Sequence, residues 1–184
     1  MHRSSTACDP RLGAQSTEPA HAMPGRAVAL LAIGCLSLAA GVLVYLTDRS
    51  AMHALLIPAA ATLPGWHRFG VIGLWLPSFV HPLSFSLFSA ALLAAQPRWE
   101  YGACAFWFAV NAAFEIGQHP QIRVPLAEAL GHILGQSPIS RALQSYFLRG
   151  TFDLGDLIAA ALGALVAAVI LHSLRVHQEN RHAP

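Results

Sequence analysis

Residues 152–172 read FDLGDLIAAALGALVAAVILH, an apolar run with two aspartates at its start and no further Asp, Glu, Lys or Arg. About 20 apolar residues are enough for a helix to cross the roughly 30 Å hydrocarbon core of a bilayer. The run therefore predicts a membrane-spanning helix. A charged side chain at membrane depth costs about 2.5–3.5 kcal/mol on insertion scales. Asp153 and Asp156 are therefore expected to pair with another polar group, to face a water-filled cavity or to have a functional role.

Three more apolar stretches precede this one, at residues 27–46, 77–95 and 99–117. The first is longer than the core of a signal peptide, usually about 7–15 residues, which favours an uncleaved span over a cleaved leader. Pro82 lies inside the second, removes a backbone donor and predicts a kink. We expect an all-α, polytopic membrane helical bundle with four transmembrane helices, in which residues 26–174 form one membrane domain.

The composition agrees with a membrane protein. Of the 184 residues, 55% are hydrophobic and 11% are charged, whereas soluble domains carry about 25% charged residues. The lysine-free, alanine-rich sequence is typical of GC-rich bacterial coding. A net charge of +2 without a basic cluster gives no reason to expect a nucleic-acid partner. The expected partner is the lipid bilayer of the bacterial inner (plasma) membrane, and the arginines that flank the tails favour cytoplasmic termini.

Polar or broken segments are expected outside the spans. Residues 1–25 are rich in Ser, Pro and Ala, which predicts a disordered tail, and residues 175–184 are expected to form a polar C-terminal tail. Ser50 is placed to cap a short helix that Pro58 would end. Gly70–Leu76 either re-enters the membrane or begins the second span.

The connection between the last two spans contains two segments with helical periodicity. Pro125–Leu134 is the first, and the second follows Ser137 and Pro138, which are typical of an N-cap and a first helical residue. Both segments have polar residues on the opposite face. They predict amphipathic helices at the membrane surface, with a soluble helical hairpin as the alternative.

Span order predicts that the polar residues of the later spans meet. In an alternating bundle, the second span begins on the side where the third ends and the fourth begins. His81 lies early in the second span, Glu115 late in the third, and Asp153 and Asp156 early in the fourth. All four are therefore expected at a similar depth near one membrane face.

Helical spacing adds neighbours to this set. Asn111, Glu115 and Gln118 follow an i, i+4, i+7 pattern and share one helix face. The two aspartates begin a second stripe, which continues through small residues suited to close packing in lipid. Arg149 precedes the fourth span and is placed to offset the negative charge.

Several kinds of chemistry fit these residues. The candidate acid/base or catalytic residues are Glu115, Asp153, Asp156 and His81, and the candidate substrate-binding residues are Gln118, Arg149 and Asn111. Crowded carboxylates can share a proton for general acid/base work, carry protons in a transporter, or hold a divalent cation. No motif specifies a metal or another cofactor.

Structural roles are the alternatives for the same residues. The aspartates are suited to N-caps, and His81 to the carbonyls that Pro82 frees. Asn111 and Gln118 are suited to hydrogen bonds between helices.

The cysteines give no sign of redox or zinc chemistry, because no C-x-x-C pair occurs. Cys8 lies in the polar tail. Cys35 and Cys104 lie inside apolar stretches and are expected to be buried free thiols.

The order of these motifs resembles the VanZ-like family of small bacterial membrane proteins. The shared pattern is a histidine in SFVHPLSFSLF, the Glu-x-x-Gln of FEIGQ, an arginine, and then FDLGDLIAAALG, over residues 75–165. The residues that match are Glu115, Gln118, Asp156 and Gly163, with His81 and Arg149 matching less closely. The chain departs from the family at Ala160, where the family has asparagine, and in its longer segment between Gln118 and Arg149.

The resemblance implies a bundle of four or five membrane helices with inward-facing polar residues and a link to the cell envelope. The family's namesake is associated with glycopeptide antibiotic resistance, and no settled biochemical activity attaches to the family. Our first hypothesis is a VanZ-like envelope protein whose polar pocket binds or modifies a lipid or glycolipid headgroup. The alternatives are a small proton-coupled transporter and a non-catalytic structural or assembly protein.

Overall fold

The computed structural model of the chain describes residues 24–48, 69–93 and 96–182. Within these ranges the chain forms six α-helices and no strand. The helices are α1 (Pro24–Asp48), α3 (Gly70–Leu92), α4 (Pro97–Gly117), α5 (Arg123–Leu134), α6 (Pro138–Arg149) and α7 (Leu154–His182). The expected all-helical class is confirmed for this part of the chain. The predictions for residues 1–23 and for a capped helix after Ser50 lie outside it.

Two helices extend beyond the boundaries expected from the sequence. Gly70–Leu76 forms the first turns of α3, so this segment begins the second apolar helix and is not a separate re-entrant piece. Pro77 and Pro82 both lie inside that helix. The polar residues expected as a C-terminal tail continue α7 as far as His182.

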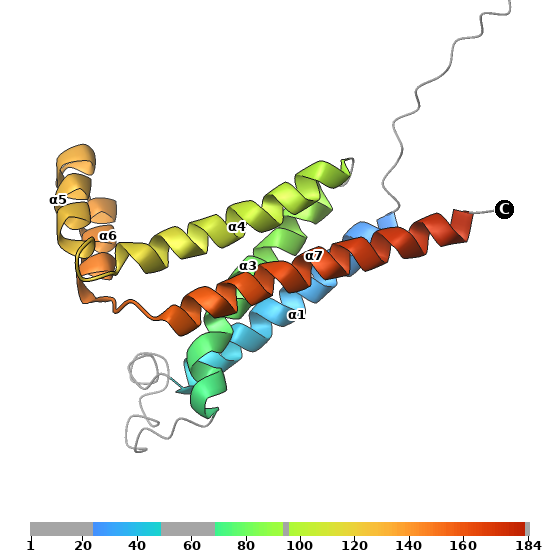
Figure 1. Cartoon of the computed structure of the whole chain (residues 1–184), viewed down its shortest axis with the longest axis horizontal. Helices are drawn as coiled ribbons and strands as arrows, with labels where there is room; N and C mark the ends of the chain where they lie inside the picture. Colours follow the sequence, from blue (N-terminus) through green and yellow to red (C-terminus); the bar gives the residue numbers. More distant parts are fainter. Residues whose placement is uncertain (1–23, 49–68, 94–95, 183–184) are drawn as a thin grey trace, which may run out of the picture.

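Four long helices form a bundle in which successive members run in opposite directions. Figure 1 shows α1 and α4 running one way and α3 and α7 the other. Helix α3 packs against α1, α4 and α7, and α4 also packs against α7. The buried core cluster between them consists of Leu30, Leu83, Leu87, Ala90, Cys104, Ala167 and Leu171. The ends of α3, α4 and α7 that carry the predicted polar residues consequently lie at the same end of the bundle.

Small residues set the spacing between the packed helices. A Cβ on Gly163 of α7 would collide with the backbone carbonyl of Phe79 in α3. A Cβ on Gly34 of α1 would collide with the ring of Phe88. Glycine at these positions allows the backbones to approach closely, as small residues do in membrane bundles.

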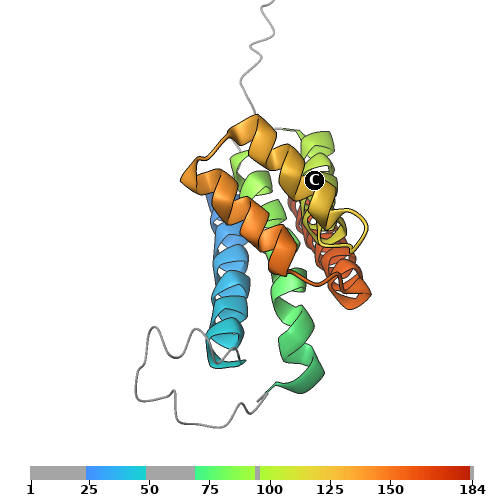
Figure 2. The same ribbon diagram turned by 90° about the vertical axis from the view of Figure 1, so that its left-hand side faces the viewer.

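The short helices α5 and α6 pack against each other and lie across one end of the long helices (Figure 2). Ser137 caps α6, because its hydroxyl accepts a hydrogen bond from the backbone nitrogen of Ser140 at 3.1 Å, and Pro138 begins the helix. This confirms the cap predicted from the sequence. Phe147 of α6 is buried against Gly117, where a Cβ would collide with its ring. The α5–α6 pair is therefore held to the end of α4.

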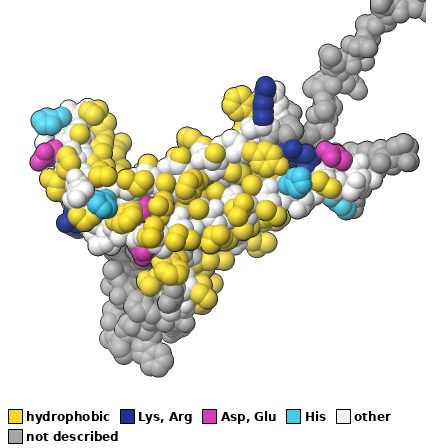
Figure 3. All heavy atoms as spheres, viewed as in Figure 1, with side chains coloured by type: hydrophobic (Ala, Val, Ile, Leu, Met, Phe, Trp, Pro, Cys, Tyr) yellow, Lys and Arg dark blue, Asp and Glu magenta, His cyan; other side chains and the backbone are white. Residues whose placement is uncertain are grey.

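Two helices of the described part are long and apolar enough to cross a membrane, at residues 25–45 within α1 and 154–180 within α7. Only 22% and 33% of an 18-residue apolar segment within each are buried, and Leu36 and Leu165 are 72% and 59% exposed. Figure 3 shows hydrophobic side chains over the middle of one face, with charged and histidine side chains towards its ends. Large exposed apolar surfaces mark contact with membranes or other proteins.

The sequence predicted four spans, whereas two helices of the described part have the required length and apolarity. The two remaining helices differ in composition. Helix α3 contains no Asp, Glu, Lys or Arg, and two prolines and a histidine interrupt its apolar sequence. In α4, Arg98 and Glu100 occupy the first turn and Glu115 lies near the end.

Candidate functional site

A polar cavity of about 720 Å³ lies where the end of α4 meets α3, α6 and the start of α7. Its volume falls in the range of about 300–1,000 Å³ that is usual for small-molecule sites. Six of the residues singled out from the sequence line it: His81, Asn111, Glu115, Gln118, Arg149 and Asp156. The cavity therefore brings together side chains from four helices that are far apart in the sequence.

Asp156 connects α7 to α3 inside this cavity. Its Oδ1 accepts a hydrogen bond of 2.6 Å from the hydroxyl of Ser78, and both side chains line the cavity wall. The carboxylate is partly buried. Ser78 was not singled out for this role from the sequence, and only the packing of α3 against α7 identifies it.

Glu115 connects α4 to the segment that leads into α7. Its Oε1 accepts a hydrogen bond of 2.5 Å from the backbone nitrogen of Asp153. No described residue donates a hydrogen bond to Oε2 of Glu115. Glu115 therefore lies close to the start of the last apolar helix, as expected, and the contact is with the backbone of Asp153.

Asp153, expected among the acid/base candidates, does not line the cavity. Its Oδ1 accepts a hydrogen bond of 2.8 Å from the backbone nitrogen of Gly155, and its Oδ2 accepts one of 3.3 Å from the indole of Trp75. It directly precedes the first residue of α7. This is the position and bonding of an N-cap residue, which satisfies a free helix N–H. The capping alternative therefore describes the contacts of its side chain, and the acid/base role stays a prediction.

Gln118 is buried and joins α4 to α6. Its Nε2 donates a hydrogen bond of 2.8 Å to the hydroxyl of Tyr146. Its Oε1 packs against Gly150, where a Cβ would collide with the amide. Asn111 instead bonds within its own helix, to the carbonyl of Trp107 at 2.8 Å. Gln118 thus holds helices together while it lines the cavity, as one of the sequence alternatives proposed.

His81 and Arg149 are the exposed members of the set. The His81 ring stacks near Phe85, with 6.1 Å between ring centroids. Arg149 occupies the last turn of α6, where a positive charge interacts favourably with the helix dipole. Neither side chain has a hydrogen bond or ion pair with another described residue. The cavity thus contains a guanidinium that forms no ion pair with a described residue, together with the carboxylates of Glu115 and Asp156.

Within the described ranges, no group of three His, Cys, Asp or Glu side chains is arranged to hold a metal ion. His81, Glu115, Asp153 and Asp156 do not converge as one ligand set. What the arrangement provides is hydrogen-bonding and charged groups of both signs around an open space.

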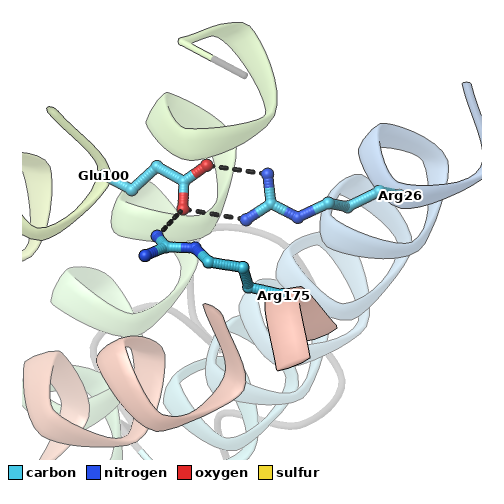
Figure 4. Close-up of polar contacts among 3 residues, drawn as sticks. All are labelled: Arg26, Glu100 and Arg175. Atoms are coloured by element: carbon cyan, nitrogen blue, oxygen red, sulfur yellow. Dashed lines mark hydrogen bonds and ion pairs between the residues drawn. The ribbon is translucent and has the colours of Figure 1, made fainter. Parts of the chain in front are cut away.

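A buried charge cluster that was not predicted from the sequence lies at the opposite end of the bundle (Figure 4). Glu100 of α4 is 2% exposed and accepts hydrogen bonds from Arg26 of α1 at 2.7 and 2.8 Å and from Arg175 of α7 at 3.0 Å. Arg175 also lies over the ring of Tyr101. The sequence placed both arginines on the same side of the bundle, and a carboxylate in the first turn of α4 was the available signal.

The two described cysteines differ in exposure. Cys104 is buried in the core cluster, as expected, whereas Cys35 is exposed on the outer face of α1. The expectation of a buried thiol is wrong for Cys35, because that face of α1 is not covered by another described helix. Cys8 lies outside the described residues.

Comparison of the chain with family models, with curated proteins and with solved structures found no match. The VanZ-like resemblance stays a prediction from the sequence.

Proposed function

We propose that the chain is a VanZ-like, multi-pass protein of the bacterial inner membrane, with α1, α3, α4 and α7 as its spans. The polar cavity at one end of the bundle binds the headgroup of an envelope lipid or glycolipid. The observation that carries this proposal is the cavity itself, which presents Glu115, Asp156 and Arg149 at the end of helices whose outer faces are apolar.

The lengths of α3 and α4 support the inclusion of both as spans. They contain 23 and 21 residues, and at about 1.5 Å per residue they are about 35 and about 32 Å long. Both lengths are sufficient to cross the hydrocarbon core of a typical bilayer, about 30 Å thick. Three of their polar side chains are turned inward, since Ser84, Ser86 and Glu100 are at most 2% exposed, whereas His81 and Arg98 are exposed. A helix with its polar groups inside the bundle can present an apolar surface to lipid.

The chemistry of the cavity suits a polar headgroup near the membrane surface. A guanidinium binds phosphate or carboxylate oxygens through charge-assisted hydrogen bonds. Free carboxylate oxygens accept hydrogen bonds from hydroxyl and amine groups. Arg149 and the carboxylates of Glu115 and Asp156 provide these two functions in one cavity.

Lipid binding by the purified full-length protein in detergent tests this proposal. Native mass spectrometry with a total lipid extract from bacterial inner membranes should detect a retained lipid. Glu115→Gln and Arg149→Gln should each weaken its retention, whereas Glu128→Gln and Arg98→Gln, at exposed positions outside the cavity, should not. Equal retention by all four variants would contradict the proposal.

The structural alternative is supported by the hydrogen bonds that cross between elements at the cavity. Ser78 bonds Asp156, Gln118 bonds Tyr146, and Glu115 bonds the segment before α7. If these residues only hold the helices together, Glu115→Gln will lower thermal stability while lipid retention at low temperature stays unchanged. The same variants therefore separate the two functions.

A further inference from the structure

A second, apolar groove of about 170 Å³ lies between α1 and α3. Four residues line the groove and not the polar cavity, namely Leu38, Gly41 and Val42 of α1 and Val80 of α3. Gly41 keeps the groove open, because a Cβ there would lie 3.1 Å from Cγ1 of Val80. Val42 is 48% exposed, so one side of the groove faces the surroundings of the bundle. Its walls suit a hydrocarbon chain.

The groove adjoins the polar cavity. Tyr45, Pro77 and His81 line both spaces. A ligand that occupied both would place an apolar part between α1 and α3 and a polar part among α4, α6 and α7, with His81 at the junction. This polarity is that of an amphipathic lipid, with an acyl chain beside a headgroup.

The charges in the cavity restrict the headgroup. Asp156 and Glu115 each use one carboxylate oxygen, with Ser78 and with the backbone of Asp153. Arg149 has no ion pair among the described residues, although it lines the same cavity. A headgroup with a phosphate and a primary amine complements this set, because the phosphate can pair with Arg149 and the ammonium with the carboxylates.

We propose that the cavity and the groove form one site for a single zwitterionic lipid with a phosphate and a primary amine in its headgroup. The headgroup lies among Arg149, Glu115 and Asp156, and part of one acyl chain lies in the groove between α1 and α3. This inference rests on the headgroup-binding function proposed above and specifies its ligand.

The test uses four defined probes and the full-length protein in detergent. The probes are dioleoyl phosphatidylethanolamine, dioleoyl phosphatidylglycerol, dioleoylglycerol and glycerophosphoethanolamine, which has the headgroup without chains. Phosphatidylethanolamine should bind with a stoichiometry of one. The other three should bind about tenfold or more weakly, since each lacks either a charge-assisted contact or the buried chain.

Matched tryptophan variants test the groove. Val42→Trp places an indole at the groove and should weaken phosphatidylethanolamine binding by about tenfold, the effect of losing one to two buried methylenes. Leu36→Trp adds the same indole at a 72% exposed position of α1 outside the groove and should leave binding unchanged. Both variants are first checked for an unchanged unfolding temperature.

The outcomes distinguish this inference from the function on which it rests. If Glu115→Gln and Arg149→Gln weaken binding but Val42→Trp does not, the groove is not occupied and headgroup binding stands. If phosphatidylglycerol binds as tightly as phosphatidylethanolamine, the zwitterionic headgroup is wrong. If no variant changes the retention of any lipid, both the inference and the proposed function fail.

Discussion

The carboxylate of Glu100 accepts two hydrogen bonds from the guanidinium of Arg26, at 2.7 and 2.8 Å, and so ties the start of α4 to the start of α1. The pair is nearly inaccessible, with side-chain exposures of 2% and 11%. Arg175 adds a third bond from α7. One carboxylate thus holds three helices together at the end opposite the polar cavity.

Glu100→Gln should destabilise the protein by about 3–5 kcal/mol, the usual cost of removing one partner of a buried ion pair. The variant leaves the partly buried guanidinium groups of Arg26 and Arg175 without the negative charge of Glu100. Chemical unfolding in detergent micelles, followed by circular dichroism, measures the effect. Glu128→Gln on the exposed surface of α5 is the control and should change stability little. An unfolding curve for Glu100→Gln that matches wild type would contradict the assignment.

The two arginines should differ in their contributions to stability. Arg26→Gln removes two hydrogen bonds from a side chain that is 11% exposed, whereas Arg175→Gln removes one from a side chain that is 25% exposed. The less exposed charge is screened less by solvent. Arg26→Gln should therefore lower the unfolding free energy more than Arg175→Gln. The reverse order would mean that the α7 contact is dominant.

Gly163→Ala should destabilise the α3–α7 packing although alanine favours helices. The new methyl would collide with the backbone carbonyl of Phe79, so the helices must move apart, at about 1–3 kcal/mol for overpacking. Gly102→Ala adds the same methyl where nothing lies within 4 Å. It should be neutral or stabilising by up to about 1 kcal/mol. Thermal unfolding of both variants makes the comparison, and equal effects would exclude close backbone packing at Gly163.

Substitutions of Asp153 should affect stability and not ligand binding. Asp153→Ala removes the N-cap of α7 and should cost about 0.5–2 kcal/mol, whereas Asp153→Asn caps nearly as well and should cost only a few tenths. Because the side chain does not line the cavity, lipid retention should stay at the wild-type level in both. If the Asp153→Asn protein no longer retained lipid, Asp153 would be part of the binding site.

Cys35 reports on whether α1 contacts lipid. It lies on the exposed face of α1, whereas Cys104 is buried. In proteoliposomes of a Cys8→Ser protein, Cys35 should react with a lipid-soluble maleimide and not with a polar, membrane-impermeant one. Cys104 should react with neither before unfolding. The positive control for the polar reagent is Glu128→Cys, on the exposed surface of α5, introduced into the Cys8→Ser protein. If Cys35 reacted with the polar reagent as fast as this cysteine does, α1 would lie in water.

The helices were largely predictable because their signals are local. Apolar runs, the Ser137–Pro138 cap and the proline and glycine breaks fix where α1, α5, α6 and much of α4 begin and end. The length of α7 was less predictable. Residues 175–184 were expected to form a polar tail, and α7 continues into this stretch as far as His182. Arg175 begins the stretch, pairs with Glu100 and lies over Tyr101, which are contacts between helices that the local sequence does not encode.

For the site, the sequence predicted which residues lie at the same end of the bundle, but not their contacts. Helical spacing predicted that Asp153 and Asp156 share one helix face, but Asp153 precedes the helix and its carboxylate accepts a hydrogen bond from the backbone nitrogen of Gly155. Helical periodicity does not apply to a cap residue. Ser78 and Tyr146 were not predicted as partners, because their bonds depend on how the helices are rotated against each other.

The sequence by itself determined that this protein is helical, which stretches are apolar, and that His81, Glu115 and Asp156 belong to one end of the bundle. Those properties depend on local periodicity and on the alternation of helix direction. The tertiary structure alone decided that Asp153 caps, that Glu100 holds two arginines, and that an apolar groove adjoins the polar cavity. These depend on distances between helices far apart in the sequence, which local patterns do not encode.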